Sequence, residues 1–528
     1  MTQIKSMFKS KFVLSPTWLR FLIIVLLLLG VFFRFVNLDR KVYWHDEAYT
    51  SLRISGYTMA EVFQQVFDDR EIGIEDLQKY QQLNPEKGLV DTIRSLAVED
   101  PQHPPLYYVL LRFWVQRFGT SIAAVRSLTA LISLLVFPCI YWLCQELFES
   151  SLVGLVAIAL IAVSPIHILF AQEAREYCLW TVTILLSSAS LLQAMRLNTK
   201  LSWGIYAATV ALGLYTFLFS GFVAIGHGIY VVLTQSFRLR KKVINYLIAS
   251  SAGLLSFAPW LLVIFAKRSQ FSLTTDWTNN HITLTSLIKI WLLNLSHIFI
   301  DVGSNIGGDF TYLILVCLVG YSIYFLCRRA PMRVWLFILT LMGTTGLCLM
   351  LPDIITGGIK SSVPRYLFPC YLGIQLAVAY LLATQIISAS LLQKQVMQLT
   401  MFVLLSAGII SCTVSSQAET WWNKEISNNN PQVARIVNQA IHPLLLSNNF
   451  GINPGNIISL SYLLEQKVRL RLVVAPTSPQ IHGNLSEIFL FDTFSGTLLT
   501  RLENKYKVEL VRNLIEPRFD QLWVVLNK

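Results

Sequence analysis

The chain has 528 residues, of which 54% are hydrophobic and 14% are charged. Soluble domains carry about 25% charged residues, so most of this chain faces something other than water, as its mean hydropathy of +0.55 also indicates. The net charge of +12 would suit nucleic acid, but the basic residues are scattered at the ends of apolar segments, as the positive-inside rule predicts. We therefore expect a lipid bilayer as partner and no nucleic acid.

The eight cysteines all lie in or beside apolar segments, and none follows residue 417. This placement predicts neither a disulfide framework nor a zinc site. Small apolar packing residues are the expected role.

The first apolar run, Phe21 to Phe33, follows the basic residues Lys5, Lys9, Lys11 and Arg20. A signal peptide would have this order of charge and apolar residues. The residues after the run offer no small-residue cleavage site, however. We expect an uncleaved anchor in the plasma (inner) membrane, with the N-terminus in the cytoplasm.

A membrane-spanning helix needs about 20 mostly apolar residues. The candidate spans are 18–36, 121–145, 152–170, 178–196, 202–218, 220–236, 243–265, 311–327, 334–351, 366–390 and 398–416. Residues 104–118 are apolar but short. The densest basic loops, 237–242 and 327–333, both lie inside only if 104–118 does not cross, so we expect it to form an interfacial helix on the outer leaflet.

This topology predicts an α-helical polytopic membrane protein of about eleven spans. Residues 1–416 form the membrane module, with a large first outer loop at 37–120. Residues 417–528 form a small extracytoplasmic α/β domain without an obvious catalytic group. Its expected elements are a helix at 432–446 and strands at 468–474, 488–491, 508–511 and 522–526, of which the first alternates polar and apolar residues.

The first outer loop carries the adjacent carboxylates Asp46 and Glu47. Each raises the pKa of the other, which makes the pair a candidate general base or metal ligand. If a helix starts near Asp46, Tyr49 and Arg53 share its face. The alternative is that the two carboxylates only favour the N-terminus of an interfacial helix.

His103 precedes two prolines further along the same loop. Its imidazole could donate to a phosphate or substrate oxygen, or bind a metal. The alternative is a polar cap of the following helix.

The outer end of another span carries Glu173, Arg175 and Glu176, followed by Tyr177. Three charges in four residues between apolar spans are costly and are usually functional. We assign Arg175 to an anionic substrate. The alternative is a structural salt bridge from Arg175 to Glu173 or Glu176.

Lys360, Arg365 and Tyr366 lie at another outer interface, where they could clamp a phosphate. The alternative is that Arg365 only extends to the lipid headgroups. All four features fall on one side of the expected membrane. Carboxylates with separated cations suit a transfer reaction in which a base deprotonates an acceptor hydroxyl and the cations stabilise a departing phosphate.

These motifs resemble the GT-C class of polyprenyl-phosphate-dependent glycosyltransferases. Within it they resemble family 39, with the protein O-mannosyltransferases, and its bacterial relatives such as the lipid A aminoarabinose transferases. The matching segments are residues 44–48, 103–108, 164–165 with 172–177, and 365–367. The resemblance extends over residues 18–240, is thinner from 240 to 416, and rests on position alone in the tail.

The resemblance implies inverting transfer from a polyprenyl-phosphate sugar. Asp46 matches the family's catalytic aspartate, and Glu47 is its companion. Arg175 and Arg365 stand where the family handles the lipid-linked phosphate. His103 stands where the aminoarabinose transferases typically place a lysine, so their donor and acceptor do not carry over directly.

Family members differ in whether they use a metal, so no cofactor is required. A divalent metal ion could be held by Asp46, Glu47, His103 and Glu173. A lipid-linked donor is also favoured independently, because nucleotide sugars are cytoplasmic and the cytoplasmic loops are short and carry no Gly-rich phosphate loop. The expected acceptor is a hydroxyl of a lipid, glycan or protein.

The expected catalytic residues are therefore Asp46 and Glu47. The expected substrate- or phosphate-binding residues are His103, Arg175, Tyr177, Lys360, Arg365 and Tyr366. A transporter or flippase of lipid-linked sugars is the alternative, although transporters place ionisable groups near the midplane and often consist of repeated halves. A scaffold whose outer tail binds partners is a third hypothesis.

Overall fold

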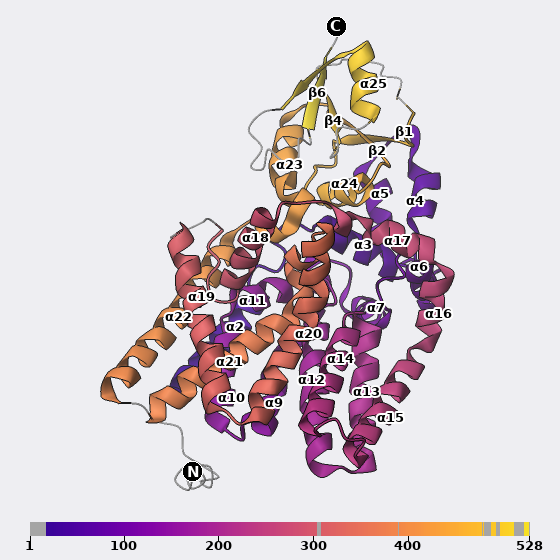
Figure 1. The fold of residues 1–528 in the computed structure, drawn as a ribbon. Helices are drawn as coiled ribbons and strands as arrows, with labels where there is room; N and C mark the ends of the chain where they lie inside the picture. Colours follow the sequence, from indigo (N-terminus) through magenta and orange to yellow (C-terminus); the bar gives the residue numbers. More distant parts are fainter. Residues whose placement is uncertain are drawn as a thin grey trace.

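The computed structural model describes residues 17–303, 308–388, 390–477, 479, 487–492, 497–511 and 522–526. The basic residues Lys5, Lys9 and Lys11, on which the cytoplasmic N-terminus was predicted, lie outside these ranges. Helices run side by side through the lower part of the molecule, and a small sheet with its own helices lies at one end of them (Figure 1). The last described strand, Leu522–Leu526, lies at the sheet end.

Each of the eleven expected spans coincides with one helix or with two consecutive helices. They are α2 (Thr17–Phe35), α8 (Ile122–Leu134) with α9 (Val136–Phe148), α10 (Ser151–Ala162) with α11 (Pro165–Ala171), α12 (Tyr177–Leu197), α13 (Lys200–Thr216), α14 (Ser220–Thr234), α15 (Lys241–Ser256) with α16 (Ala258–Ala266), α19 (Gly308–Arg329), α20 (Met332–Thr356), α21 (Phe368–Ser388) and α22 (Leu391–Gln417). Within the described residues, six helices are long and apolar enough to cross a membrane. The number rises to eight if the bent pairs α10–α11 and α15–α16 each form one span.

The first outer loop is folded rather than extended. It contains α3 (His45–Ile54), α4 (Met59–Val66), β1 (Asp68–Ile72), α5 (Ile74–Gln78), η1 (Lys79–Gln81), α6 (Leu89–Glu99) and α7 (Leu106–Phe118). The helix α7 is the one predicted at 104–118. Its Arg112 is buried against the loop and donates to the Ile54 carbonyl and, at 3.1 Å, to Thr92 Oγ1. This explains a charge within an apolar helix.

Further elements connect the later helices and form the tail. The connecting elements are α17 (Arg268–Thr275), η2 (Asp276–Asn279), α18 (Leu284–Ser296), η3 (Lys360–Ser362) and η4 (Pro364–Tyr366). The tail contains η5 (Trp422–Asn429), α23 (Asn430–Gln439), β2 (Leu444–Asn448), α24 (Asn453–Ser461), β3 (Arg469–Val473), β4 (Ile488–Phe491), α25 (Thr497–Lys505), β5 (Lys507–Leu510) and β6 (Leu522–Leu526).

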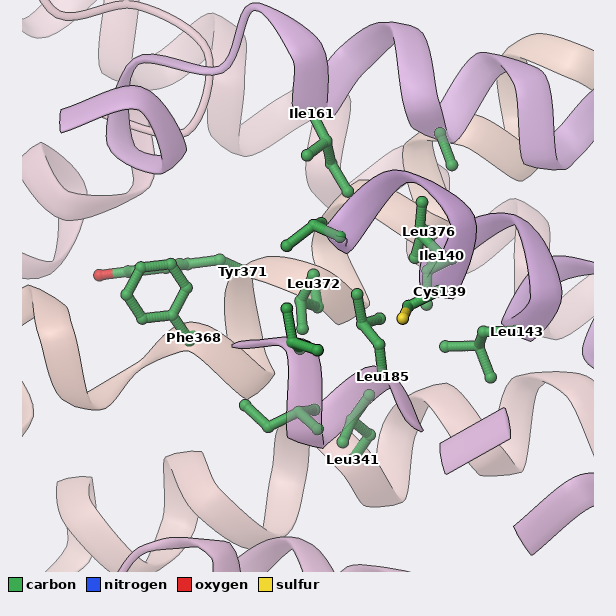
Figure 2. Packing of buried hydrophobic residues seen from close by; sticks show 14 of the residues in the cluster. Cys139, Ile140, Leu143, Ile161, Leu185, Leu341, Phe368, Tyr371, Leu372 and Leu376 are labelled. Carbon is green, nitrogen blue, oxygen red and sulfur yellow. The ribbon is translucent and has the colours of Figure 1, made fainter. Parts of the chain in front are cut away.

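Close approach of helix backbones holds the bundle together. Lipid tails are as apolar as leucine, so helices in a membrane associate mainly through packing, which small residues favour. A Cβ on Gly30 would meet the Ala162 carbonyl oxygen at 2.7 Å, and one on Gly226 would meet that of Thr340 at 2.8 Å. Larger side chains fill the space between α9, α12, α20 and α21, where the labelled leucines and Ile140 lie together (Figure 2).

The sheet joins the first outer loop to the tail. Its strand order is β1-β3-β2-β4-β6-β5, and β1 from the loop pairs antiparallel with β3. Below the sheet, Ala48 and Leu52 of the loop share one buried cluster with Val433 and Ile457 of the tail. The two segments therefore fold together, although a division between domains was predicted at residue 417.

The four predicted tail strands are confirmed as β3 to β6, but the predicted helix at 432–446 is wrong in its second half. The helix α23 ends at Gln439, and β2 begins at Leu444 after Pro443. Proline lacks an N–H and disfavours helix in the residue before it. The run Leu444 to Leu446 therefore becomes a buried parallel strand between β3 and β4.

Gly455 of α24 provides a test of this union of loop and tail. A Cβ there would lie 2.6 Å from a ring carbon of Tyr49 on α3. We predict that Gly455→Ala lowers the free energy of unfolding by about 1–3 kcal/mol, as overpacking does, measured as a lower thermal midpoint in detergent. Gly204→Ala is the control, since a helical Cβ there meets nothing within 4 Å. Equal midpoints for the two variants would contradict this packing.

Candidate active site

The acidic pair lies in the first turn of α3. Trp44 is the extended N-cap residue, and its backbone N–H donates to Glu47 Oε2 at 3.3 Å. A helix therefore starts at His45, directly before Asp46. Successive helical residues point about 100° apart because a turn takes 3.6 residues, so the two carboxylates enter different surroundings.

Glu47 is fully buried and fastens the loop to the bundle. Its carboxylate accepts two hydrogen bonds from Arg126 of α8, at 2.7 and 2.6 Å, and one from the Ala174 N–H at 2.9 Å. Arg126 also donates to three carbonyls within residues 38–42. Burial alone would raise the pKa of Glu47, but Arg126 and Lys424 lower it. These contacts anchor α3 to the bundle and leave none of the Glu47 surface exposed, and the catalytic role of Glu47 stays a prediction.

Asp46 remains accessible, with 23% of its side chain exposed, and its Oδ1 lies 3.3 Å from His45 Nε2. Burial acts to raise the pKa of Asp46, but the positive charges of Arg175, His45 and Arg365 outweigh it and hold that pKa well below its ordinary value. The carboxylate is thus ionised at neutral pH and faces cations from two other segments.

Arg175 lies in the loop between α11 and α12 and points at the start of α3. Its Nη1 donates to Thr50 Oγ1 at 3.1 Å, to Tyr108 Oη at 3.2 Å and to the Asp46 carbonyl at 3.4 Å. Its Nη2 lies 3.3 Å from Glu176 Oε1. The alternative role foreseen for Arg175, a salt bridge to Glu176, is therefore present, and the guanidinium also lies beside Asp46.

His103 joins the same cluster. Its Nδ1 lies 3.0 Å from Glu176 Oε1, and its Nε2 lies 3.3 Å from Arg175 Nη2. Glu176 is fully buried, whereas 20% of the His103 side chain is exposed. Tyr177 packs below, with its ring centre 5.7 Å from the Arg175 guanidinium carbon. His103, from one predicted feature, thus lies together with Arg175 and Tyr177, from another.

Arg365 of η4 approaches the site from the other side. The rings of Trp44, Trp277 and Tyr366 surround its guanidinium, with ring centres 5.5, 5.7 and 5.8 Å from its central carbon. Its ion-pair partner is Glu425 of the tail, at 2.9 Å. Lys360 does not join this group, because its ammonium donates to Asn279 Oδ1 at 3.2 Å.

The tail contributes charges that sequence reasoning missed. Lys424 is buried, 2.7 Å from Glu173 Oε1 and 3.7 Å from Glu47 Oε2. Asn423 also donates to Glu173. The sequence held two signals for this network: Arg126 is a cation within an apolar span, and the charged Lys424-Glu425 pair closely follows the last span.

The predicted metal set of Asp46, Glu47, His103 and Glu173 is not assembled. Across the described residues, no three His, Cys, Asp or Glu side chains come together as metal ligands. Two of the three carboxylates in this set, those of Glu47 and Glu173, already face buried cations. These donors do not fit a divalent ion, and no step of the chemistry below depends on one.

Breaking the pair of Glu47 and Arg126 tests whether it holds the site. We predict that Arg126→Gln lowers the free energy of unfolding by about 3–5 kcal/mol, because it leaves a buried carboxylate without its main partner. Thermal unfolding in detergent measures this change. Arg333→Gln, which breaks an exposed pair with Glu149, should cost less than about 1 kcal/mol. Similar losses in both variants would contradict the assigned role.

Comparison with known proteins now gives this geometry a context. Residues 102–263, less than a third of the chain, match the family model described as dolichyl-phosphate-mannose-protein mannosyltransferase. That range includes His103 and Arg175 but neither Asp46 nor Arg365. No curated protein sequence is similar enough to this chain to be detected as a relative.

Solved structures match over most of the chain. ArnT from Cupriavidus metallidurans bound to undecaprenyl phosphate has a TM-score of 0.57 at 11% identity, over 97% of this chain and 98% of that one. AglB, the oligosaccharyltransferase from Archaeoglobus fulgidus in complex with an inhibitory peptide and a dolichol-phosphate, has a TM-score of 0.50 at 12% identity, over 86% of this chain and 64% of that one. The chain is therefore an integral membrane protein with the fold of the GT-C glycosyltransferases that its motifs resemble.

Proposed function

We propose that the protein is an inverting glycosyltransferase that moves a sugar from a polyprenyl-phosphate donor to a hydroxyl of a lipid, glycan or protein. The observation that carries this proposal is the accessible, ionised Asp46 beside the buried cations Arg175 and Arg365. The lipid phosphates bound to ArnT and AglB support a polyprenyl-phosphate donor. The site then lies outside the plasma membrane with the tail, and the N-terminus is cytoplasmic.

In the proposed reaction, Asp46 accepts the proton of the acceptor hydroxyl while that oxygen attacks the anomeric carbon. The bond from the anomeric carbon to the phosphate oxygen breaks, and the lipid phosphate leaves with an additional negative charge. Arg175 and Arg365 stabilise this charge, as preorganised cations do in a buried site. His103 and Tyr177 hold Arg175 in place through the contacts described above.

Donor binding would also strengthen the base. In the free protein, Arg175 and Arg365 hold the pKa of Asp46 low, and a carboxylate with so low a pKa is a weak proton acceptor. A phosphate beside these cations offsets their charge, which raises the pKa of Asp46. The acceptor is thus activated mainly when the donor is present, and this order protects the donor from premature attack by water.

Replacing Asp46 tests its proposed role as the base. In a host strain that lacks this protein, the Asp46→Asn variant should reach the membrane in normal amount but restore less than about 1% of the glycan product, since a positioned base contributes about 10²–10⁴-fold. Mass spectrometry of glycans and glycolipids measures the product. Asp39→Asn is the matched control, because Asp39 is exposed in the same loop. Wild-type product levels with Asp46→Asn would contradict the assignment.

The lowered pKa of Asp46 also predicts how kcat/KM depends on pH. Because the pKa of Asp46 is lowered, its ionised form persists as pH falls, so protonation of Asp46 should not reduce kcat/KM between about pH 8 and 5. Arg175 is the strongest of the cations that lower this pKa. The residual activity of Arg175→Gln should therefore fall off at a higher pH than that of the wild type. The exposed Arg435 gives the control variant Arg435→Gln. If kcat/KM of Arg175→Gln falls at the same pH as that of the wild type, Arg175 does not lower the pKa of Asp46 and the prediction is wrong.

A further inference from the structure

Arg365 already has an anionic partner within the protein. The guanidinium is buried among three aromatic rings, and its ion-pair partner in the described structure is the Glu425 carboxylate at 2.9 Å. Only 8% of the Arg365 side chain is exposed, against 42% for Glu425. The arginine is thus fixed in the site, while its partner can turn away into solvent.

The backbone of Glu425 is held in an unfavourable conformation. Its φ of 48° and ψ of −123° interrupt the helical geometry of η5. A residue with a Cβ rarely adopts such angles, and they persist only where the surrounding structure imposes them. The ion pair with Arg365 therefore coexists with local strain in the segment that supplies the carboxylate.

The surrounding structure does impose this conformation. Before Glu425, the indole N–H groups of Trp421 and Trp422 both donate to Asp301 Oδ2, at 2.9 and 2.7 Å. Lys424 is fixed by Glu173. After Glu425, Ser427 Oγ accepts the His45 N–H at 3.1 Å. These anchors leave Glu425 as the exposed residue of a segment otherwise fastened to the site.

We propose that the Glu425 carboxylate occupies the phosphate position on Arg365 and that the phosphate of the lipid-linked donor displaces it. This inference rests on the proposed function. Carboxylate and phosphate are the two anions that a guanidinium binds in the same planar geometry. Arg365 is confined by its aromatic neighbours, so the phosphate can bind its guanidinium only by replacing the Glu425 carboxylate. The neighbouring anchors stay in place during this exchange, so only the Glu425 side chain turns away.

The exchange makes the tail part of donor recognition. A neutral residue at position 425 would leave Arg365 without this counter-ion in the free protein, and a buried unpaired charge is costly. Glu425 supplies the missing charge at the expense of competing with the donor. The tail thus keeps the empty site stable and sets the affinity for the lipid phosphate.

The experiment measures binding of undecaprenyl phosphate to the purified full-length chain in detergent, by microscale thermophoresis. Glu425→Gln removes the competing charge and should bind about five- to tenfold more tightly than the wild type, because the competent state no longer requires displacement of an ion pair. Glu425→Gly, which also suits the positive φ, should bind at least as tightly. The matched control is Glu419→Gln, since Glu419 pairs with Arg435 in the exposed part of the tail and should leave affinity unchanged.

The outcomes separate this inference from the proposed function. Arg365→Gln should bind undecaprenyl phosphate more weakly than the wild type. If it does, but neither Glu425 variant binds more tightly, the displacement is wrong and the phosphate site stands. If the wild type binds no undecaprenyl phosphate, or Arg365→Gln binds it equally well, both this inference and the proposed phosphate site are wrong.

Discussion

The ion pair between Glu47 and Arg126 is the interaction on which the rest of the site depends. Arg126 belongs to the helix bundle, and Glu47 belongs to the first turn of the outer-loop helix α3. The same carboxylate accepts the N–H of Ala174, the residue before Arg175. One buried group therefore sets the positions of both Asp46 and Arg175, which approach from segments more than 120 residues apart.

The site rests on a buried layer of charged side chains. Lys41, Arg126 and Lys424 lie around Glu47 and Glu173, and all five are buried. Burial, and then the nearby Lys424 and Arg126, lower the pKa of Lys41 to about 7. Lys41 is therefore only partly protonated at neutral pH, and Arg126 and Lys424 are the full cations that face the two carboxylates. The tail supplies one of these cations, Lys424, which lies 2.7 Å from Glu173 and 3.7 Å from Glu47 of the first loop.

Hydropathy was sufficient to predict the helices of the bundle. The spans are long apolar runs, and their periodicity needs no partner to be recognised. The sequence could not show that β1 in the first loop would pair with β3 in the tail, because strand pairing depends on contacts between distant residues. The helix predicted over 432–446 failed for a related reason, since Leu444 to Leu446 form a strand only because β3 and β4 flank them.

In the candidate site, too, local patterns could be predicted and contacts between distant residues could not. Asp46, His103, Arg175 and Arg365 stand out because charges beside apolar spans are costly, and the structure brings them together. The different roles of Asp46 and Glu47 could not be read from adjacent letters, since they depend on Arg126 in another helix. Glu425 was also missed, because the charged Lys424-Glu425 pair signals a network but does not show that its partner is Arg365, 60 residues earlier in the chain.

The most direct test of the central claim is turnover by the purified protein in detergent, where no sealed compartment exists. A polyprenyl-phosphate sugar and a hydroxyl acceptor are supplied, and mass spectrometry follows both products. The account predicts that the acceptor gains the sugar with inverted anomeric configuration while free polyprenyl phosphate appears in equal amount. Movement of the intact donor across reconstituted vesicles, with no turnover in detergent, would contradict it and identify a flippase instead.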